Sequence, residues 1–305
     1  MTMFNFEKAR NFVYRNARPL DFARWKYHFE NGSAENIINI LSAYQNEDGG
    51  FAYAIEPDNW NTESTPIGTW FAIMKLHEID FNNSDHQIIK GILKYLDSGK
   101  DFAEGKWFNT VASNNNYPHA AWWECDNKAG VPDNNPTVSL TGFALKFSDK
   151  NSSLYNKAKI IAINAVKEFL ENPTDEFHTL RCFTDLLGYC EEIESFDLFD
   201  LHQFKEKLIE QMNKVICGDP EKWSTDYVCK PSVFFADKNR IFHAVSSELA
   251  KKEADMIIKE QLDDGSFPIL WQWYNDYKEF EISANWWKSD IIIKNILYLK
   301  YLKKI

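Results

Sequence analysis

The sequence predicts an all-α fold, and three observations carry this prediction. Apolar residues recur at helical spacing through most of the 305-residue chain, as at Ile37, Ile38 and Leu41. No segment shows the apolar–polar alternation that is typical of a half-buried strand. A seven-residue turn pattern occurs twice, at residues 45–51 and 261–267, and such recurrence is typical of repeated helical units.

The first helices follow from their capping and breaking residues. Residues 3–17 are expected to form a helix that Pro19 closes. Ser33 is placed to cap a helix that runs to Tyr44. Pro66 suits the first turn of the next helix, because its missing N–H would have no partner there.

The later helices follow in the same way. Ser84 and Gln87 form a capping box for a helix that ends before Gly99. Residues 100–135 and 219–238 lack helical spacing and are expected to be irregular. The remaining helices are expected from Asn135-Pro136, at about 152–171, 174–191 and 200–217, before Gln261, and from near Asn285 onward.

The two turns share a chemistry as well as a spacing. Each begins with a glutamine, Gln45 or Gln261, that follows an apolar helical pattern. An Asp-Gly pair comes next, and Gly49 and Gly265 are suited to positive φ and to closing a helix at C′. The glutamine amide both donates and accepts hydrogen bonds, so it can tie the helix end to the backbone of the next segment.

This pattern resembles the repeat motif of the terpenoid cyclase and protein prenyltransferase superfamily of α/α toroids. Those repeats usually end in Trp, whereas Phe51 and Phe267 stand here. Residues 54–58 and 64–70 are also similar to bacterial toroid proteins of that superfamily. The resemblance is clear over residues 33–80 and 245–303.

The resemblance implies an α/α toroid, a barrel of helical hairpins. No Pro-, Gly- or Ser-rich linker divides the sequence, so residues 1–305 are expected to form one domain.

Composition and net charge argue against some classes of binding partner. A net charge of −11 argues against binding to a nucleic-acid backbone or an anionic membrane, since both need clustered Lys and Arg. The sequence shows no signal peptide and no apolar run long enough to span a membrane. The five cysteines include no C-x-x-C pair and are typical of reduced residues rather than of a disulfide or zinc framework. We therefore expect a cytoplasmic protein with a small-molecule ligand and without a protein-bound metal.

A first candidate site lies just after the first turn. Glu56 and Asp58 are two residues apart and are followed by Trp60. Paired carboxylates can act as general acid and base or hold a metal. They can equally cap the start of the next helix, and the sequence leaves both interpretations open.

A second candidate site is the segment that contains His119 and Glu124 beside Trp122 and Trp123. A histidine and a carboxylate next to two indoles can perform acid–base chemistry on a bound ligand. The alternative is structural, with one Trp in the core and His119 bonded to the backbone.

A third candidate site is the aromatic run near the C-terminus. Exposed clusters of this kind tend to mark binding surfaces, although core packing explains them equally well. The residues in this group are Trp271, Trp273, Tyr274, Trp286, Trp287 and Asp290.

The resemblance implies that these three groups share one central cavity, because loops converge at one end of a toroid and its first and last hairpins are neighbours. The catalytic motifs of the superfamily are absent, however. The sequence has no D-x-D-D and no D-D-x-x-D motif, and Asp226 and Cys229 have the wrong spacing for the zinc ligands of protein prenyltransferases. The resemblance therefore supplies a scaffold without its usual catalytic residues.

Three functional hypotheses remain at this point. The first is an enzyme of unestablished activity that binds or transforms a small apolar or ring-shaped ligand, with His119, Glu124, Glu56 or Asp58 as acid or base. The second is a carbohydrate-active α/α barrel of the glycosidase or lyase type, because tryptophan faces with paired carboxylates also hold sugar rings. The third is a toroid that binds a ligand or partner without catalysis. No cofactor can be inferred from the sequence.

Overall fold

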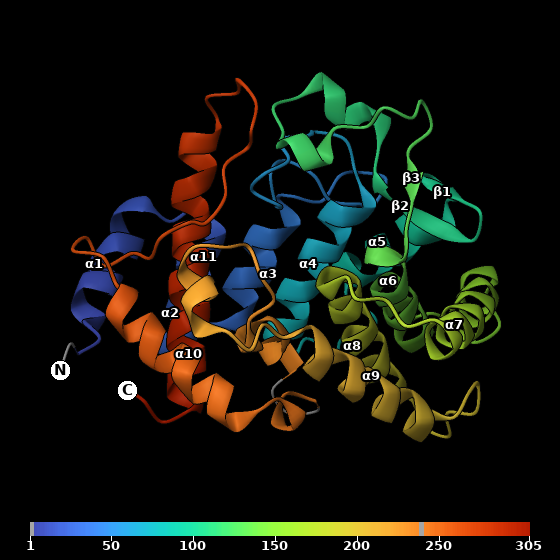
Figure 1. Cartoon of the computed structure of the whole chain (residues 1–305). Helices are drawn as coiled ribbons and strands as arrows, with labels where there is room; N and C mark the ends of the chain where they lie inside the picture. Colours follow the sequence, from blue (N-terminus) through green and yellow to red (C-terminus); the bar gives the residue numbers. More distant parts are fainter. Residues whose placement is uncertain (1–2, 238–240) are drawn as a thin grey trace.

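The structure, a computed structural model, describes residues 3–237 and 241–305 and is mostly helical, as the sequence predicts (Figure 1). The α-helices are α1 (Phe6–Asn16), α2 (Pro19–Phe29), α3 (Ala34–Ser42), α4 (Pro66–Glu78), α5 (Gln87–Asp97), α6 (Asn134–Phe147), α7 (Ser153–Glu171), α8 (Phe177–Glu191), α9 (Leu201–Val215), α10 (Ser247–Glu260) and α11 (Phe280–Tyr301). Short 3-10 helices are η1 (Ala112–Asn116), η2 (Ala121–Trp123), η3 (Pro220–Ser224), η4 (Pro231–Asp237) and η5 (Phe242–Ala244).

Side-chain caps begin most of the helices where the sequence places them. The Ser33 hydroxyl accepts a hydrogen bond from the Asn36 N–H, and the Thr65 hydroxyl accepts one from the Gly68 N–H. Pro66 occupies the first turn of α4. The predicted capping box at residue 84 is wrong, because the imidazole of His86 accepts from the Ile88 N–H and begins α5 instead.

The helices form a closed path of contacts. From α2 the path runs through the α2–α4 ion pair Arg24–Glu78 and then through contacts of α4 with α6, α6 with α8, α8 with η4, η4 with α10, and α10 with α11. The last helix, α11, then contacts both α1 and α2 (Figure 1). The two ends of the described chain therefore lie side by side, although nearly the whole sequence separates them.

Burial distinguishes two kinds of helix along this path. In α6 every residue from Pro136 to Leu145 is buried, and α4 and α8 are buried around most of their circumference. By contrast, α5, α7 and α9 bury one face each. A helix that is apolar on all sides belongs in the interior, so α4, α6 and α8 form the inside of the molecule and α5, α7 and α9 its outside.

The two turns have the same structure. Gly49 and Gly265 have φ of +93° and +94°. The Gln45 amide donates to the carbonyl of Gly49 at 2.9 Å, and the Gln261 amide donates to that of Gly265 at 3.3 Å. The positive φ was predicted, but the predicted closure of α3 by Gly49 is wrong, because α3 ends at Ser42 and the glycine lies within the turn.

Both glutamines also bind the start of another helix, as their chemistry predicts. The Gln45 amide donates to the Ile88 carbonyl of α5 at 3.1 Å. Gln261 bonds to Asn5, the N-cap of α1, both by donating to its carbonyl at 3.0 Å and by accepting from its N–H at 2.7 Å. The second turn therefore joins the C-terminal part of the chain to its beginning.

Two further parts of the sequence prediction are corrected by the structure. Residues 100–135 contain a small antiparallel sheet, β1 (Phe102–Ala103), β2 (Lys106–Thr110) and β3 (Val131–Pro132), in the order β1-β2-β3. These strands are too short to produce a readable alternation. Helix α11 begins at Phe280, about one turn earlier than expected. The stretch 219–238, which is expected to be irregular, contains the short helix η3. Residue 238 lies outside the described part of the chain.

Candidate functional site

Three loops that are distant in sequence pair through their backbones. The Ala120 N–H donates to the Asp58 carbonyl at 2.9 Å, and the Trp60 N–H donates to the Pro118 carbonyl at the same distance. The Ala121 N–H donates to the Trp273 carbonyl at 3.0 Å. Residues 56–60, 117–123 and 271–277, called the site loops below, therefore form one unit that holds members of all three candidate groups.

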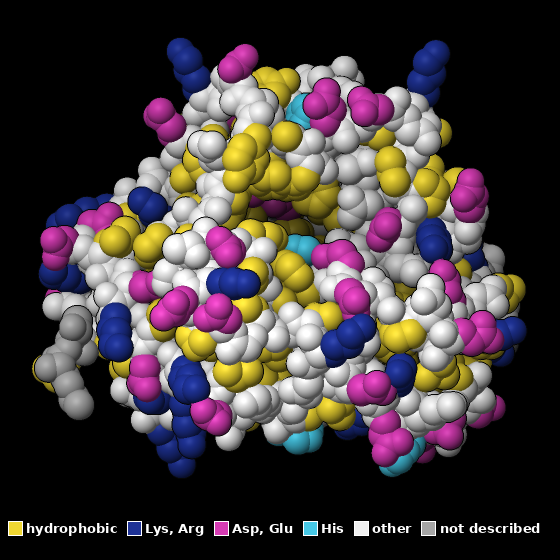
Figure 2. Space-filling view, in the orientation of Figure 1, with side chains coloured by type: hydrophobic (Ala, Val, Ile, Leu, Met, Phe, Trp, Pro, Cys, Tyr) yellow, Lys and Arg dark blue, Asp and Glu magenta, His cyan; other side chains and the backbone are white. Residues whose placement is uncertain are grey.

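Figure 2 shows a hollow on this face of the molecule, with hydrophobic walls and acidic side chains in its depth. A pocket borders the acidic loop, and its lining includes Glu56, Asn59, Asn61 and Thr65. The hollow is thus apolar on its walls and polar beneath them, which is the usual composition of a small-molecule site.

Asp58 is held by two tryptophans of another site loop. Its carboxylate accepts hydrogen bonds from Trp273 Nε1 at 2.7 Å and from Trp271 Nε1 at 3.2 Å. The side chain is 2% exposed. Burial raises the pKa of Asp58, and the indole donors oppose that rise because they stabilise the charged form.

Glu56 is buried next to Asp58. It is 4% exposed, and its Oε2 has no hydrogen-bond partner in the described structure. Burial raises the pKa of Glu56 well above its ordinary value, and the charge of Asp58 adds to the rise, while Arg18 opposes it. Glu56 is therefore the carboxyl group that keeps its proton more readily.

Arg18 fixes the position of this loop. From the N-cap of α2, its guanidinium donates to the carbonyls of Ala54 at 2.6 Å and Ile55 at 3.1 Å, and to Asp21 Oδ2 at 2.6 Å. The backbone that immediately precedes Glu56 is thus tied to the start of α2.

Replacement of Glu56 is expected to change how stability depends on pH. Between pH 4.5 and the higher pKa in the folded state, the unfolded chain ionises Glu56 while the folded chain keeps it neutral, so wild-type stability falls as pH rises. Glu56→Gln does not titrate. The melting temperature of the variant relative to that of the wild type should therefore rise from pH 5 to pH 8. Glu124→Gln, at an exposed position, is the control, and an equal pH trend in both variants would contradict the assignment.

Aromatic side chains from four segments of the chain follow one another in contact. Their ring centroids are 6.3 Å apart for Tyr227 and Trp271, 5.6 Å for Trp271 and Trp287, 6.2 Å for Trp287 and Phe71, and 5.3 Å for Phe71 and Trp70. These five residues are called the aromatic wall below. Indole and phenyl faces at such spacings give a ligand broad apolar contact at a low entropy cost.

Two residues of α8 close the aromatic wall. The Arg181 guanidinium lies over the Trp70 ring at 5.9 Å, and His178 Nε2 lies 3.1 Å from the Tyr227 hydroxyl. Trp70 Nε1 also donates to Asp185 Oδ2 at 3.2 Å. Tyr227 and Trp70, the two end members of the aromatic wall, thus both contact helix α8.

A second aromatic pair joins α11 to the acidic loop. Trp60 and Trp286 stack with centroids 5.3 Å apart and planes 15° from parallel. Trp60 Nε1 donates to Ser283 Oγ at 2.9 Å, and this hydroxyl donates to the Pro57 carbonyl at 2.6 Å. Helix α11 therefore holds the loop that carries Glu56 and Asp58 through its residues Ser283 and Trp286.

Several buried polar atoms around the hollow have no hydrogen-bond partner in the described part of the chain. Leaving such an atom unsatisfied costs about 1–3 kcal/mol, so native structures contain few of them. These atoms are Glu56 Oε2, Trp123 Nε1, Trp287 Nε1, Arg181 Nε and Asp185 Oδ1. Buried polar atoms of this kind are candidates for hydrogen bonds to a bound ligand.

The second candidate group is only partly brought to the site. Trp123 is buried against Ile67 and Trp273. His119 is buried, and its Nδ1 lies 2.7 Å from the Tyr117 carbonyl, so the ring proton is assigned to Nδ1. Trp122 is 41% exposed and Glu124 is exposed as well. Neither makes any of the contacts that join the site loops, because η2 turns both side chains toward solvent.

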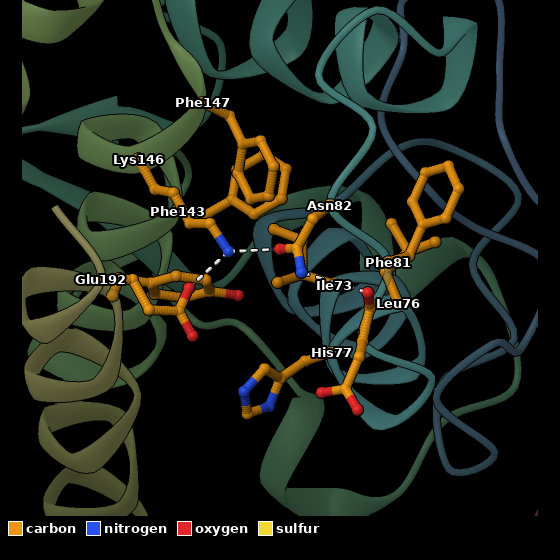
Figure 3. Close-up of a pocket in the computed structure, with 11 residues that line it drawn as sticks. Ile73, Leu76, His77, Phe81, Asn82, Phe143, Lys146, Phe147 and Glu192 are labelled. Atoms are coloured by element: carbon orange, nitrogen blue, oxygen red, sulfur yellow. Dashed lines mark hydrogen bonds and ion pairs between the residues drawn. The ribbon is translucent and has the colours of Figure 1, made fainter.

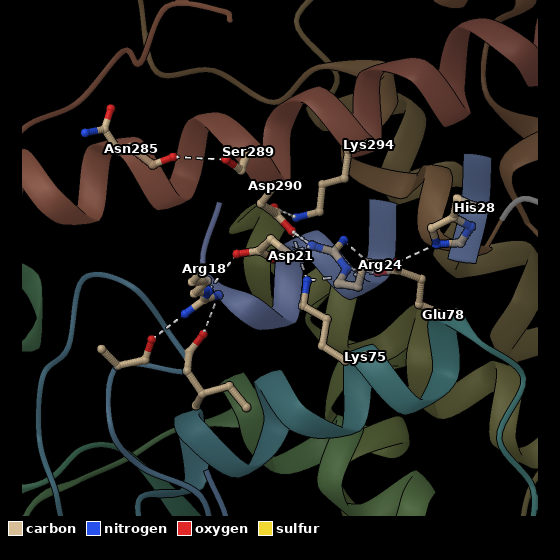
Figure 4. A network of polar contacts seen from close by, with 12 residues as sticks. Arg18, Asp21, Arg24, His28, Lys75, Glu78, Asn285, Ser289, Asp290 and Lys294 are labelled. Atoms are coloured by element: carbon tan, nitrogen blue, oxygen red, sulfur yellow. Dashed lines mark hydrogen bonds and ion pairs between the residues drawn. The ribbon is translucent and has the colours of Figure 1, made fainter. Parts of the chain in front are cut away.

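Asp290 lies in an ionic network with Arg24, Lys75 and Lys294 (Figure 4). Its Oδ1 is 2.6 Å from Arg24 Nη1 and 2.9 Å from Lys75 Nζ. Glu78 binds the same guanidinium at 2.8 Å. Asp290 thus joins helices α2, α4 and α11 through ion pairs.

Burial and neighbouring charge set the ionisation within this network. Burial lowers the pKa of Lys75 to about 8, and the positive charge of Arg24 adds to this effect, while Asp290 opposes it. Neighbouring cations lower the pKa of Asp290 well below its ordinary value despite its burial. The network was missed from the sequence. Its signal is the i, i+3 spacing of Arg18, Asp21 and Arg24, which places three charged residues on one face at the start of a helix.

A second pocket lies between the C-terminal ends of α4, α6 and α8 (Figure 3). Ile73, Leu76 and Phe143 form its apolar part. Lys146 crosses it and bonds both Asn82 and Glu192. Its polar groups are thus paired with one another, and none of the sequence-predicted site residues lines it.

The described residues contain no group of three or more His, Cys, Asp and Glu side chains placed to hold a metal ion. In the same part of the chain, no helix has the length and apolar character needed to cross a bilayer. Comparison of the chain with protein-family models, with curated proteins and with solved structures found no match.

Proposed function

We propose that the chain is a single α/α-toroid domain whose central hollow binds and transforms a small ring-shaped or apolar molecule. Two features support the toroid. The contacts of the helices form a closed path from α2 back to α2, and the two glutamine turns have the same hydrogen bonds. The fold proposal also agrees with the resemblance of the turns to the terpenoid cyclase and prenyltransferase superfamily.

The observation that carries the functional proposal is the position of Glu56. Burial and a neighbouring carboxylate raise the pKa of this buried carboxyl group, and one of its oxygens has no hydrogen-bond partner in the described structure. In this proposal Glu56 donates its proton to the bound ligand. The carboxylate that remains is stabilised by the positive charge of Arg18, and the proton returns from solvent after product leaves.

Asp58 has a different role in this proposal. Its two indole hydrogen bonds favour its charged form, so it supplies a negative charge next to the reacting carboxyl group. This charge raises the proton affinity of Glu56 and favours a positive charge that develops on the ligand. Two carboxyl groups with different environments are a common arrangement for dividing acid and electrostatic roles.

Loss of Trp271 is expected to weaken ligand binding about tenfold, because the ligand loses one stacking face and Asp58 loses a donor. Binding can be followed through intrinsic tryptophan fluorescence with a probe panel of methyl pyranosides, farnesol and cyclohexanecarboxylate. Trp122→Ala is the matched control, since Trp122 lies outside the site loops' contacts and is exposed. Equal affinities in Trp271→Ala and wild type would place the binding site elsewhere.

Glu56→Gln is expected to bind the same probe and to lower its turnover about 10²–10⁴-fold, the usual contribution of a general acid. Turnover is measured by mass spectrometry of each bound probe after incubation with the protein. Glu248→Gln provides the comparison, because it is the same substitution at an exposed position of α10. A substrate that is consumed at the same rate by Glu56→Gln and wild type would refute the assigned role.

A further inference from the structure

We infer that the ligand is a hydroxylated ring of the pyranose type, held through its hydroxyl groups by Arg181 and Asp185 on one side and by Glu56, Trp123 and Trp287 on the other. This inference rests on the proposed function, because it names the class of molecule that the same hollow receives. The other two classes considered are an isoprenoid hydrocarbon and a small anion.

The first set of hydrogen-bonding atoms lies on α8. Arg181 Nε is a donor and Asp185 Oδ1 an acceptor, one helical turn apart, and both are buried without a partner. No ion pair of Arg181 exists within the described structure, whereas Arg18 and Arg24 each bind a carboxylate. Asp185 is anchored through its other oxygen, which accepts from Ser139 Oγ at 2.8 Å and from Trp70 Nε1.

The second set lies beside the acidic loop. Trp123 Nε1 and Trp287 Nε1 are donors, and Glu56 Oε2 belongs to a carboxyl group. All three atoms are buried and make no hydrogen bond of ordinary geometry, although Trp123 lies near Glu56 and Trp287 near Asp58. Trp287 and Trp70 both contact Phe71, and Trp123 packs in the cluster that Phe71 joins. The two sets therefore flank the same aromatic side chains.

The mixture of donors and acceptors selects among the ligand classes. A ring hydroxyl donates one hydrogen bond and accepts others, so neighbouring hydroxyls can satisfy Arg181 and Asp185 together. A hydrocarbon can satisfy none of these atoms. An anion can satisfy Arg181 but leaves the acceptor of Asp185 unpaired and meets the negative charges of Asp58 and Asp185.

The aromatic wall fits the same class. A pyranose ring has C–H faces that pack on indole and hydroxyl edges that point outward in the plane of the ring. Trp271 and Trp287 are both half-buried, so each keeps part of its surface open to a ligand. Sites built to bind hydroxyl groups reject analogues that lack them, because the protein atoms are then left unpaired.

Fluorescence titration of the full chain with single probes tests the inference. Methyl α- and β-D-glucopyranoside, galactopyranoside, mannopyranoside and xylopyranoside represent hydroxylated rings. Farnesol represents isoprenoids, and cyclohexanecarboxylate represents anionic rings. We expect saturable binding of at least one pyranoside. Asp185→Asn and Arg181→Gln should each weaken it tenfold or more, while Asp255→Asn on the exposed side of α10 leaves it unchanged.

Arg181→Gln keeps the test valid if Asp185→Asn destabilises the fold, because Arg181 is only half-buried. Pyranoside binding that both variants leave intact would overturn the inference. Preferential binding of farnesol or of cyclohexanecarboxylate would overturn it too, while leaving the proposed function in place. If no probe in the panel perturbs the fluorescence of the wild-type protein, the inference and the proposed function fail together.

Discussion

Asp290→Ala is expected to lower the free energy of unfolding by about 3–5 kcal/mol, as removal of one partner from a buried ion pair does. Asp290 is buried and bonds Arg24 and Lys75, both of them buried as well. Without its carboxylate, Arg24 still pairs with Asp21 and Glu78, whereas the buried Lys75 keeps only Glu78, at 4.0 Å, among the described residues. Urea unfolding at neutral pH measures the change.

A surface pair gives the matched comparison for this variant. Asp263 pairs with Lys8 at 3.5 Å, and its side chain is fully exposed. Asp263→Ala should change stability by no more than about 1 kcal/mol, because exposed pairs contribute little. An Asp290→Ala variant as stable as Asp263→Ala would show that the network does not hold α2, α4 and α11 together.

Gly265→Ala is expected to destabilise the fold by about 2–5 kcal/mol, from the cost of a left-handed residue together with a steric overlap. A Cβ at this position would lie 2.2 Å from the carbonyl atoms of Lys8 in α1. Those atoms belong to backbone that Gln261 ties to the second turn through Asn5. The substitution therefore strains the contact between the end of the chain and its beginning.

Gly99→Ala separates the two contributions to this effect. Gly99 also has a positive φ, of +76°, but no atom lies within 4 Å of a Cβ added there. Its substitution should cost only the conformational part, about 1–2 kcal/mol. If thermal and urea unfolding give the two alanine variants the same stability, the close approach of the second turn to α1 is not a stabilising contact.

Local chemistry made much of the helical structure predictable from sequence. Helix α7, expected at 152–171, spans Ser153–Glu171, because a serine cap and a continuous apolar stripe specify it. The two turns were readable for the same reason: glycine at positive φ and a glutamine with two hydrogen-bonding functions permit few alternatives. The strands of the small sheet escaped prediction, since their pairing depends on contacts outside the segment.

The residue types of the candidate site were predictable from the sequence, whereas the residues that they contact were less so. Glu56, Asp58 and Trp271 were identifiable because carboxylates and indoles gather there in the sequence. That Trp271 and Trp273 bond Asp58, more than 200 residues away, depends on the closed path of helices and could not be read locally. Glu124 illustrates the reverse error: it stands next to Trp123 in sequence, but the short helix η2 turns it to solvent.

Arg181 and Asp185 carried no local signal at all. They are a charged pair on a helix that is buried on nearly every side, and either residue alone is compatible with a structural role. Only the structure shows that each has a polar atom without a partner and that both contact Trp70.

The protonation state of Glu56 tests the central proposal most directly. Selective carbon-13 labelling of glutamate and NMR titration of the side-chain carboxyl carbon, with Glu56→Gln to assign its signal, report this state without knowledge of the substrate. The account predicts that the Glu56 carboxyl titrates at a pH well above that of an exposed glutamate, because burial and Asp58 raise its pKa. A signal that titrates near pH 4.5, as in an exposed glutamate, would contradict the proposal that Glu56 is the proton donor.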